Sequence, residues 1–255
     1  MPGALSWLDD LTITRKVDGP PLLLLHGGSG PLDGMPFWSD LTGDFDVIAP
    51  THPGFAATPS PYDCDTVDDL AYLYLDLMDR LDIRDAVLMG FSIGGWIAAE
   101  IAVKSTARLS RMILVDAVGI KVGDRETRDI ADVFIHSPAV LAEKLYHDPS
   151  KAPDLSAMSQ EEQHKAAYNQ QSLALYGWEP YLHNPKLKGR LHRVDIPTLL
   201  IWGGSDGIVT PAYGAAYCDF IPGARMVVID EAGHSPQFEQ PEKFVDQVRG
   251  FARES

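Results

Sequence analysis

Apolar residues fall along the chain in two kinds of pattern, which predict strands and helices in alternation. Short apolar runs followed by turn residues predict buried strands at 21–25, 46–49, 86–89, 112–115, 198–202 and 226–229. Apolar residues at helical spacing predict helices at 67–81, 93–104, 213–220 and 242–251. Strands that alternate with helices form mainly parallel sheets with helices on both faces, so we predict an α/β fold.

The alternation is interrupted in the second half of the chain. Between residues 123 and 194, charged residues, prolines and helical patterns occur without a convincing strand. We predict a helical cap insertion at 123–194 and a core that consists of residues 1–122 and 195–255. Open parallel sheets bind ligands beyond the carboxyl ends of their strands, so an insertion that leaves from such an end would cover the site.

Composition narrows the class of protein. The 255 residues fit one domain with an insertion. A formal net charge of −15 repels phosphate backbones and anionic lipids, so neither nucleic acid nor a membrane is an expected partner. Cys64 and Cys218 are too few for a disulfide framework, and the first residues carry no basic start or apolar signal core. We predict a cytoplasmic protein and leave its oligomeric state open.

The strongest chemical signal follows the third predicted strand, where Gly90-Phe91-Ser92-Ile93-Gly94 leads directly into a helix. This is the pattern G-x-S-x-G between a strand and a helix, which is typical of a nucleophilic serine at a sharp turn. The glycines relieve the crowding between strand and helix, and the Ile93 N–H at the helix start can hold an oxyanion. The alternative is an ordinary helix N-cap, for which serine is also favoured.

The loop after the first predicted strand, His26-Gly27-Gly28-Ser29-Gly30, supplies a second candidate donor. Glycines let a backbone approach a ligand closely, so we assign the Gly28 N–H to the oxyanion hole beside Ile93. The loop also resembles a phosphate cradle, but no Lys-Ser/Thr pair follows it. We assign His26 a structural role in fixing the loop.

A serine nucleophile needs a base, and the base needs a carboxylate to orient it. His234 follows the last predicted strand, and Asp206 follows the strand before it. Together with Ser92 they give the chain order Ser, Asp, His. Asp116, at the end of another strand, is the alternative acid. Five other histidines lie in the predicted cap without metal-ligand spacing, so we predict no metal site; they are His136, His147, His164, His183 and His192.

Five segments together resemble the alpha/beta-hydrolase superfamily. They are His26-Gly27-Gly28, His52-Pro53-Gly54-Phe55, Gly90-Phe91-Ser92-Ile93-Gly94-Gly95, Gly204-Ser205-Asp206 and Gly233-His234. The resemblance covers nearly the whole chain apart from the cap. It implies an eight-stranded, mostly parallel sheet, a cap over the pocket and no cofactor.

Single residues distinguish subgroups within this superfamily. Ser92 is not Asp, which argues against haloalkane dehalogenases and epoxide hydrolases. The loop at His26 is similar to that of the carbon-carbon hydrolases that cleave meta-ring-fission products. Those enzymes usually have Asn where this chain has Phe91 and Trp where it has Ser235. We therefore expect an esterase-like activity on small esters.

The expected reaction is attack by Ser92 on an ester carbonyl, formation of an acyl-enzyme and its hydrolysis by water. We assign Phe91 and Trp178 to the substrate pocket. Further apolar cap residues are candidates for the pocket or for packing between helices: Met158, Tyr168, Leu173, Leu175 and Tyr176. Thioester, lactone or carbon-carbon cleavage on the same triad remains open. So does a small-molecule receptor on this fold.

Overall fold

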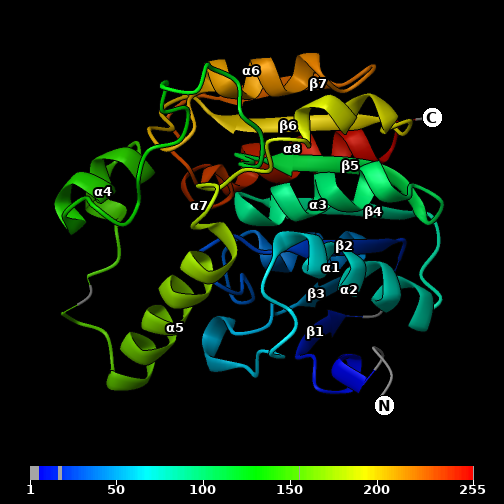
Figure 1. Cartoon of the computed structure of the whole chain (residues 1–255), viewed down its shortest axis with the longest axis horizontal. Helices are drawn as coiled ribbons and strands as arrows, with labels where there is room; N and C mark the ends of the chain where they lie inside the picture. Colours follow the sequence, from blue (N-terminus) through cyan, green and yellow to red (C-terminus); the bar gives the residue numbers. More distant parts are fainter. Residues whose placement is uncertain (1–5, 17–18, 155, 255) are drawn as a thin grey trace.

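A seven-stranded sheet runs through the part of the chain that the computed structural model describes, residues 6–16, 19–154 and 156–254 (Figure 1). In chain order its strands are β1 (Ile13–Lys16), β2 (Pro21–Leu25), β3 (Asp46–Pro50), β4 (Ala86–Phe91), β5 (Leu109–Val115), β6 (Thr198–Gly203) and β7 (Arg225–Ile229). They lie side by side in the order β1-β3-β2-β4-β5-β6-β7. β1 pairs antiparallel with β3, and the other pairs are parallel. The six predicted strands are confirmed as β2 to β7.

The implied number of eight strands is wrong for the described residues, which form seven. Before β2 the described residues form one strand, β1, and ahead of it a 3-10 helix, η1 (Ser6–Asp9). The sequence prediction missed β1 because this strand lies at the edge of the sheet and is only partly buried. Its residues Ile13-Thr14-Arg15-Lys16 therefore contain no apolar run.

Helices cover both faces of the sheet. Among the described residues the α-helices are α1 (Trp38–Asp44), α2 (Val67–Arg80), α3 (Ile93–Lys104), α4 (Pro138–Leu145), α5 (Gln160–Gly177), α6 (Pro211–Asp219), α7 (Pro236–Glu239) and α8 (Pro241–Ala252). Short 3-10 helices follow at η2 (Phe55–Ala57), η3 (Pro149–Lys151) and η4 (Lys188–Arg193). The four predicted helices are confirmed as α2, α3, α6 and α8.

Alternation along the buried strands separates two apolar cores, because successive side chains point to opposite faces of a sheet. In β2, Leu23 and Leu25 belong to the core beneath α2, α3 and α6. Leu22 and Leu24 belong to the core beneath α1 and α8. Figure 1 shows α2 and α3 in front of the sheet and α8 behind it. Because helices cover both faces of the sheet, we expect a ligand-binding or catalytic site at the ends of the strands.

Part of the chain between β5 and β6 lies beyond one end of the sheet, where Figure 1 shows α4 and α5. In its described residues it contains α4, α5, η3 and η4 but adds no strand to the sheet. The Gly207 N–H donates to the Lys144 carbonyl at 2.9 Å, and the His234 N–H donates to the Leu145 carbonyl at 2.7 Å. Since Gly207 and His234 follow β6 and β7, the end of α4 contacts the carboxyl edge of the sheet.

Candidate active site

Ser92 occupies the sharp turn between β4 and α3. Its φ of 51° and ψ of −113° are a backbone conformation that residues other than glycine rarely adopt. A Cβ on Gly90 would lie 2.2 Å from the Gly94 carbonyl oxygen, and one on Gly94 would lie 2.2 Å from the Leu25 carbonyl oxygen. The Ser92 N–H donates to the Val115 carbonyl at 2.9 Å. Glycine is therefore required at both flanking positions, and the neighbouring strands hold the turn.

Three side chains from the loops after β4, β6 and β7 meet at the carboxyl edge of the sheet. His234 Nε2 lies 3.0 Å from Ser92 Oγ, and His234 Nδ1 lies 2.7 Å from Asp206 Oδ2. A carboxylate only accepts hydrogen bonds, so Nδ1 carries the imidazole proton and Nε2 accepts from the Ser92 hydroxyl. The structure thus brings together the serine, histidine and aspartate that the sequence assigns to a triad.

Both oxygens of the Asp206 carboxylate accept hydrogen bonds. Oδ1 accepts the N–H groups of Ile208 at 2.7 Å and Val209 at 3.0 Å, while Oδ2 accepts from His234. Its side chain is fully buried, and the His234 ring is 10% exposed. Hydrogen bonds to the ionised form stabilise it in this dry site. Asp206 is therefore fixed in an orientation that also fixes the imidazole.

Asp116, the alternative acid, lies beside this pair but forms no hydrogen bond with His234 among the described contacts. Its Oδ1 accepts the Gly203 N–H at 2.9 Å. Burial, and then the negative charge of Asp206, raise the pKa of Asp116 well above its ordinary value. The Asp116 carboxyl group is therefore harder to ionise than an ordinary aspartate.

The two predicted oxyanion donors lie in segments that meet at Ser92. Ile93 is the first residue of α3, so its N–H has no acceptor within the helix. The loop that contains Gly28 lies against the turn, because a Cβ on Gly27 would be 3.4 Å from Ser92 Cβ. Backbone donors close to a serine hydroxyl can hold a developing negative charge.

His26 and His52 form a buried network beneath this loop. The His52 N–H donates to His26 Nε2 at 2.9 Å, so His26 carries its proton on Nδ1, which donates to the Gly27 carbonyl at 2.8 Å. His52 Nε2 donates to the His26 carbonyl at 2.9 Å, and His52 Nδ1 accepts from the Tyr74 hydroxyl. Both rings are neutral in this pattern. Burial lowers the pKa of His26 to about 4 and lowers the pKa of His52 well below its ordinary value.

We expect these two histidines to destabilise the protein as the pH falls from about 6.5 towards 4. In the unfolded chain they bind protons near their ordinary pKa of about 6.5, whereas folded His26 stays neutral down to about 4. The unfolded state therefore binds more protons in this window, and each histidine lowers the free energy of unfolding by about 1.4 kcal/mol per pH unit. Urea denaturation across the window measures this slope.

The variant His52→Gln should show a shallower decline of stability with falling pH than the wild type. His192→Ala, which changes an exposed histidine, is the control and should keep the wild-type slope. Identical slopes for His52→Gln and the wild type would contradict the assignment of His52 as a neutral, buried ring in the folded protein.

Helix α5 covers the predicted oxyanion loop, residues 26–30. A Cβ on Gly28 would lie 2.8 Å from Leu173 Cδ2, so Leu173 packs directly over the predicted donor. Asn169 Nδ2 donates to the Ser29 carbonyl at 2.7 Å, and its Oδ1 accepts the Ala56 N–H at 2.7 Å. Sequence reasoning missed Asn169 because its partners are 140 and 113 positions away. One buried amide thus joins α5, the oxyanion loop and η2.

Glu239, at the end of α7, was also missed. Its buried carboxylate accepts the N–H groups of Gly233 at 2.6 Å, His147 at 3.0 Å and Asp148 at 3.1 Å. Gly233 precedes the His234 base, while His147 and Asp148 follow α4. The carboxylate therefore ties the segment after α4 to the loop that holds the proposed base.

Replacing Glu239 by alanine should both destabilise the protein and slow its reaction. The change leaves three N–H groups without their acceptor; the contact with Gly233 is buried and the other two are partly buried, and a buried unsatisfied group costs about 1–3 kcal/mol. We expect the free energy of unfolding to fall by about 1–3 kcal/mol, and kcat to fall because the His234 loop is released. Urea denaturation and ester turnover measure the two effects. Glu242→Ala, at an exposed position of α8, is the matched control; wild-type stability in Glu239→Ala would contradict the assignment.

The two predicted pocket residues, Phe91 and Trp178, lie in different surroundings. Phe91 is 4% exposed, and its ring centroid lies 6.0 Å from that of Phe37 and 5.8 Å from that of Phe244 in the core beneath α1 and α8. Trp178 is 61% exposed and packs on Phe134, with 5.6 Å between ring centroids. The structure does not bring these two residues together.

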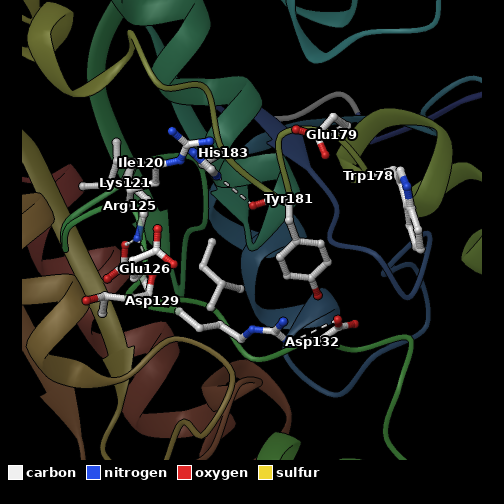
Figure 2. Close-up of a pocket in the computed structure, with 13 residues that line it drawn as sticks. Ile120, Lys121, Arg125, Glu126, Asp129, Asp132, Trp178, Glu179, Tyr181 and His183 are labelled. Atoms are coloured by element: carbon white, nitrogen blue, oxygen red, sulfur yellow. Dashed lines mark hydrogen bonds and ion pairs between the residues drawn. The ribbon is translucent and has the colours of Figure 1, made fainter.

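Trp178 instead lines a surface hollow of about 430 Å³ beside the loop after β5, and no triad residue lines this hollow (Figure 2). Charged side chains of both signs surround it. Lys121 pairs with Asp129 at 2.6 Å, and Arg128 pairs with Asp132 at 3.2 Å. These charges compensate one another, so the hollow has no clear preference for a charged ligand.

Asp116, Asp206 and His234 form a group whose potential metal-ligand atoms lie within 4.8 Å of one another. Asp206 and His234 are already hydrogen-bonded to each other, so a metal ion bound by all three residues would have to separate them.

Cys64 and Cys218 are free thiols. Within the described ranges, no helix combines the length and the apolarity that a membrane span requires.

A mainly parallel sheet with a serine turn, an acid loop and a histidine loop at its carboxyl edge defines the class of α/β hydrolases. The chain belongs to the Alpha/beta hydrolase family, whose model matches residues 22–247. The match begins in β2 and ends within α8, and membership supports hydrolase activity.

Three curated relatives are similar over most of this chain. The dihydrolipoyllysine-residue acetyltransferase component of the acetoin cleaving system of Pseudomonas putida is 28% identical over 92% of the chain, which spans 64% of that relative. A putative carbamate hydrolase of Pseudomonas savastanoi is 25% identical over 91% of the chain and 93% of the relative. A pimeloyl-[acyl-carrier protein] methyl ester esterase of Vibrio parahaemolyticus is 25% identical over 92% and 95%.

Solved structures share the fold. A bromoperoxidase from Bacillus anthracis has a TM-score of 0.76 and 18% identity, over 96% of this chain and 95% of that one. A 2-hydroxy-6-oxo-6-phenylhexa-2,4-dienoate hydrolase from Rhodococcus has a TM-score of 0.74 and 22% identity, over 96% of this chain and 100% of that one. At this level of identity the likeness establishes the fold alone.

Proposed function

We propose that this protein is a serine hydrolase that cleaves a small carboxylic ester through an acyl-enzyme intermediate. One observation carries the proposal: a continuous line of hydrogen bonds from Ser92 Oγ to His234 at 3.0 Å and from His234 to Asp206 at 2.7 Å. A serine hydroxyl is a weak nucleophile unless an adjacent base accepts its proton. This arrangement supplies that base in the tautomer that the reaction needs.

The proposed reaction has two halves. Ser92 Oγ attacks the ester carbonyl while His234 Nε2 takes its proton, and the N–H groups of Ile93 and Gly28 hold the oxyanion. His234 then gives the proton to the departing alcohol, which leaves the acyl group on Ser92. Water, deprotonated by the same ring, attacks the acyl-enzyme and releases the acid. Asp206 stabilises the imidazolium in both halves.

Three observations support a small ester as the substrate. The names of two relatives describe the hydrolysis of an ester and of a carbamate, both of which contain a carbonyl carbon bonded to oxygen. The Leu173 side chain lies over Gly28, where an acyl group would sit, and so favours a small apolar acyl group. Phe91 and Ser235 replace the Asn and Trp that are usual in carbon-carbon hydrolases, which weighs against that chemistry.

We also propose that residues 123–194 act as a cap over this site. The end of α4 contributes no side chain to the triad, but its Leu145 carbonyl accepts a hydrogen bond from the His234 N–H at 2.7 Å. On the other side, Asn169 and Leu173 of α5 contact the oxyanion loop. A cap that contacts both halves of the site would limit the size of the substrate and the access of water.

A panel of compounds tests the proposed substrate class. It consists of short-chain and long-chain p-nitrophenyl esters, a thioester, a lactone and a ring-fission dienoate, each with the wild type and with Ser92→Ala. We expect kcat/KM to be highest for short-chain esters and to depend on Ser92. A preference for the dienoate would replace the ester proposal with carbon-carbon hydrolysis. Tight binding of a compound without turnover would favour a receptor.

A further inference from the structure

A second carboxyl group, which the proposed mechanism does not use, lies beside the proposed triad. Asp116 directly follows β5, is 1% exposed and has a positive φ of 44°, which is rare for a residue other than glycine. Its Oδ1 accepts the Gly203 N–H, while Oδ2 has no hydrogen-bond partner among the described atoms. A strained, buried group with one unused polar atom at a proposed active site requires an explanation.

The unused oxygen belongs to a carboxyl group next to Asp206. One ligand atom from each of Asp116, Asp206 and His234 lies within 4.8 Å of the others. Two carboxylates this close, both shielded from water, cannot both be ionised, so the pair shares one negative charge and one proton.

The number of hydrogen-bond donors shows which carboxyl group keeps the proton. Asp206 accepts three N–H groups, those of Ile208, Val209 and the His234 ring. Among the described contacts, Asp116 accepts a single N–H group, that of Gly203. Each donor stabilises the ionised form of its acceptor, so the charge stays on Asp206 and the proton stays on Asp116.

We propose that Asp116 is a neutral positioning residue of this site, whose Oδ2–H points to Asp206 and donates a hydrogen bond to it. The inference rests on the proposed function for its catalytic consequence. With a neutral Asp116, one negative charge faces His234. An ionised Asp116 would add a second negative charge beside the ring, which would favour the imidazolium form and so hinder its action as a base. The proton on Asp116 therefore keeps His234 available as a base.

Infrared difference spectroscopy tests the proton directly and does not depend on turnover. A protonated carboxylic acid has a carbonyl stretching band that a carboxylate lacks. At neutral pH we expect this band in the wild type and in Ser92→Ala, its shift on labelling aspartate with carbon-13, and its loss in Asp116→Asn. In Asp206→Asn the band should move or disappear, because the acid loses both its carboxylate acceptor and the charge that holds its proton. A wild-type spectrum without an Asp116-dependent band, or a band that Asp206→Asn leaves in place, would overturn the proposal.

Kinetics of p-nitrophenyl acetate hydrolysis test the role of the hydrogen bond. Asn at position 116 is neutral, donates from Nδ2 and accepts from Gly203 through Oδ1, so Asp116→Asn should keep kcat/KM within about threefold and leave the acid limb of its pH profile unchanged. Asp116→Ala lacks the donor and should lower kcat about tenfold with KM unchanged. An acid limb that moves to lower pH in Asp116→Asn would mean that Asp116 carries a charge. If the wild type had no esterase activity, the proposed function would fail while the infrared result still decided the protonation state.

Discussion

Ser92→Ala should lose essentially all ester turnover, by about 10⁶-fold in kcat, which is the scale of loss when a serine nucleophile is removed from a triad. The change deletes one oxygen atom from a turn that Gly90, Gly94 and neighbouring strands hold in place, so the fold should be retained. Turnover of p-nitrophenyl acetate measures the effect, and circular dichroism checks the fold. Ser39→Ala, at an exposed position of α1, is the control and should keep wild-type activity. Retention of wild-type turnover by Ser92→Ala would show that another group is the nucleophile.

His234→Ala should cause a loss of the same order, about 10⁶-fold, because serine and histidine act as one unit. The double variant Ser92→Ala, His234→Ala should then be no slower than either single variant. His164→Ala, which changes an exposed histidine of α5, should keep wild-type turnover. If the two effects were instead to multiply in the double variant, the serine and the histidine would act independently, against the observed contact of 3.0 Å between Nε2 and Oγ.

The sequence predicts the centre of the fold better than its edges, for a physical reason. β2 and β4 to β6 are mostly buried on both faces, and each contains a run of apolar residues that is easily recognised. β1 is an edge strand of Ile13-Thr14-Arg15-Lys16, and only its pairing with β3 makes it a strand. The predicted count of eight strands came from resemblance and not from the residues, and it is the part of the fold prediction that the structure corrects.

In the candidate site, too, some residues can be recognised from the sequence and others cannot. Ser92, Asp206 and His234 each follow a recognisable strand within a glycine-containing loop, so the chain itself indicates them. Glu239 and Asn169 are ordinary polar residues on helices, and their importance depends on backbone groups that are distant in sequence. His52 belongs to a turn that the sequence does single out, but its bond to Tyr74 is visible only in three dimensions. Pairings of this kind are set by packing and leave no local pattern.

The most direct test of the central claim is to locate a covalent adduct with a fluorophosphonate, which reacts with a serine only when a base activates it. Peptide mass spectrometry of the labelled wild type should find the adduct on Ser92, and the label should be lost in both Ser92→Ala and His234→Ala. An adduct on any other residue, or a wild type that stays unlabelled while it hydrolyses esters, would contradict a mechanism in which His234 activates Ser92.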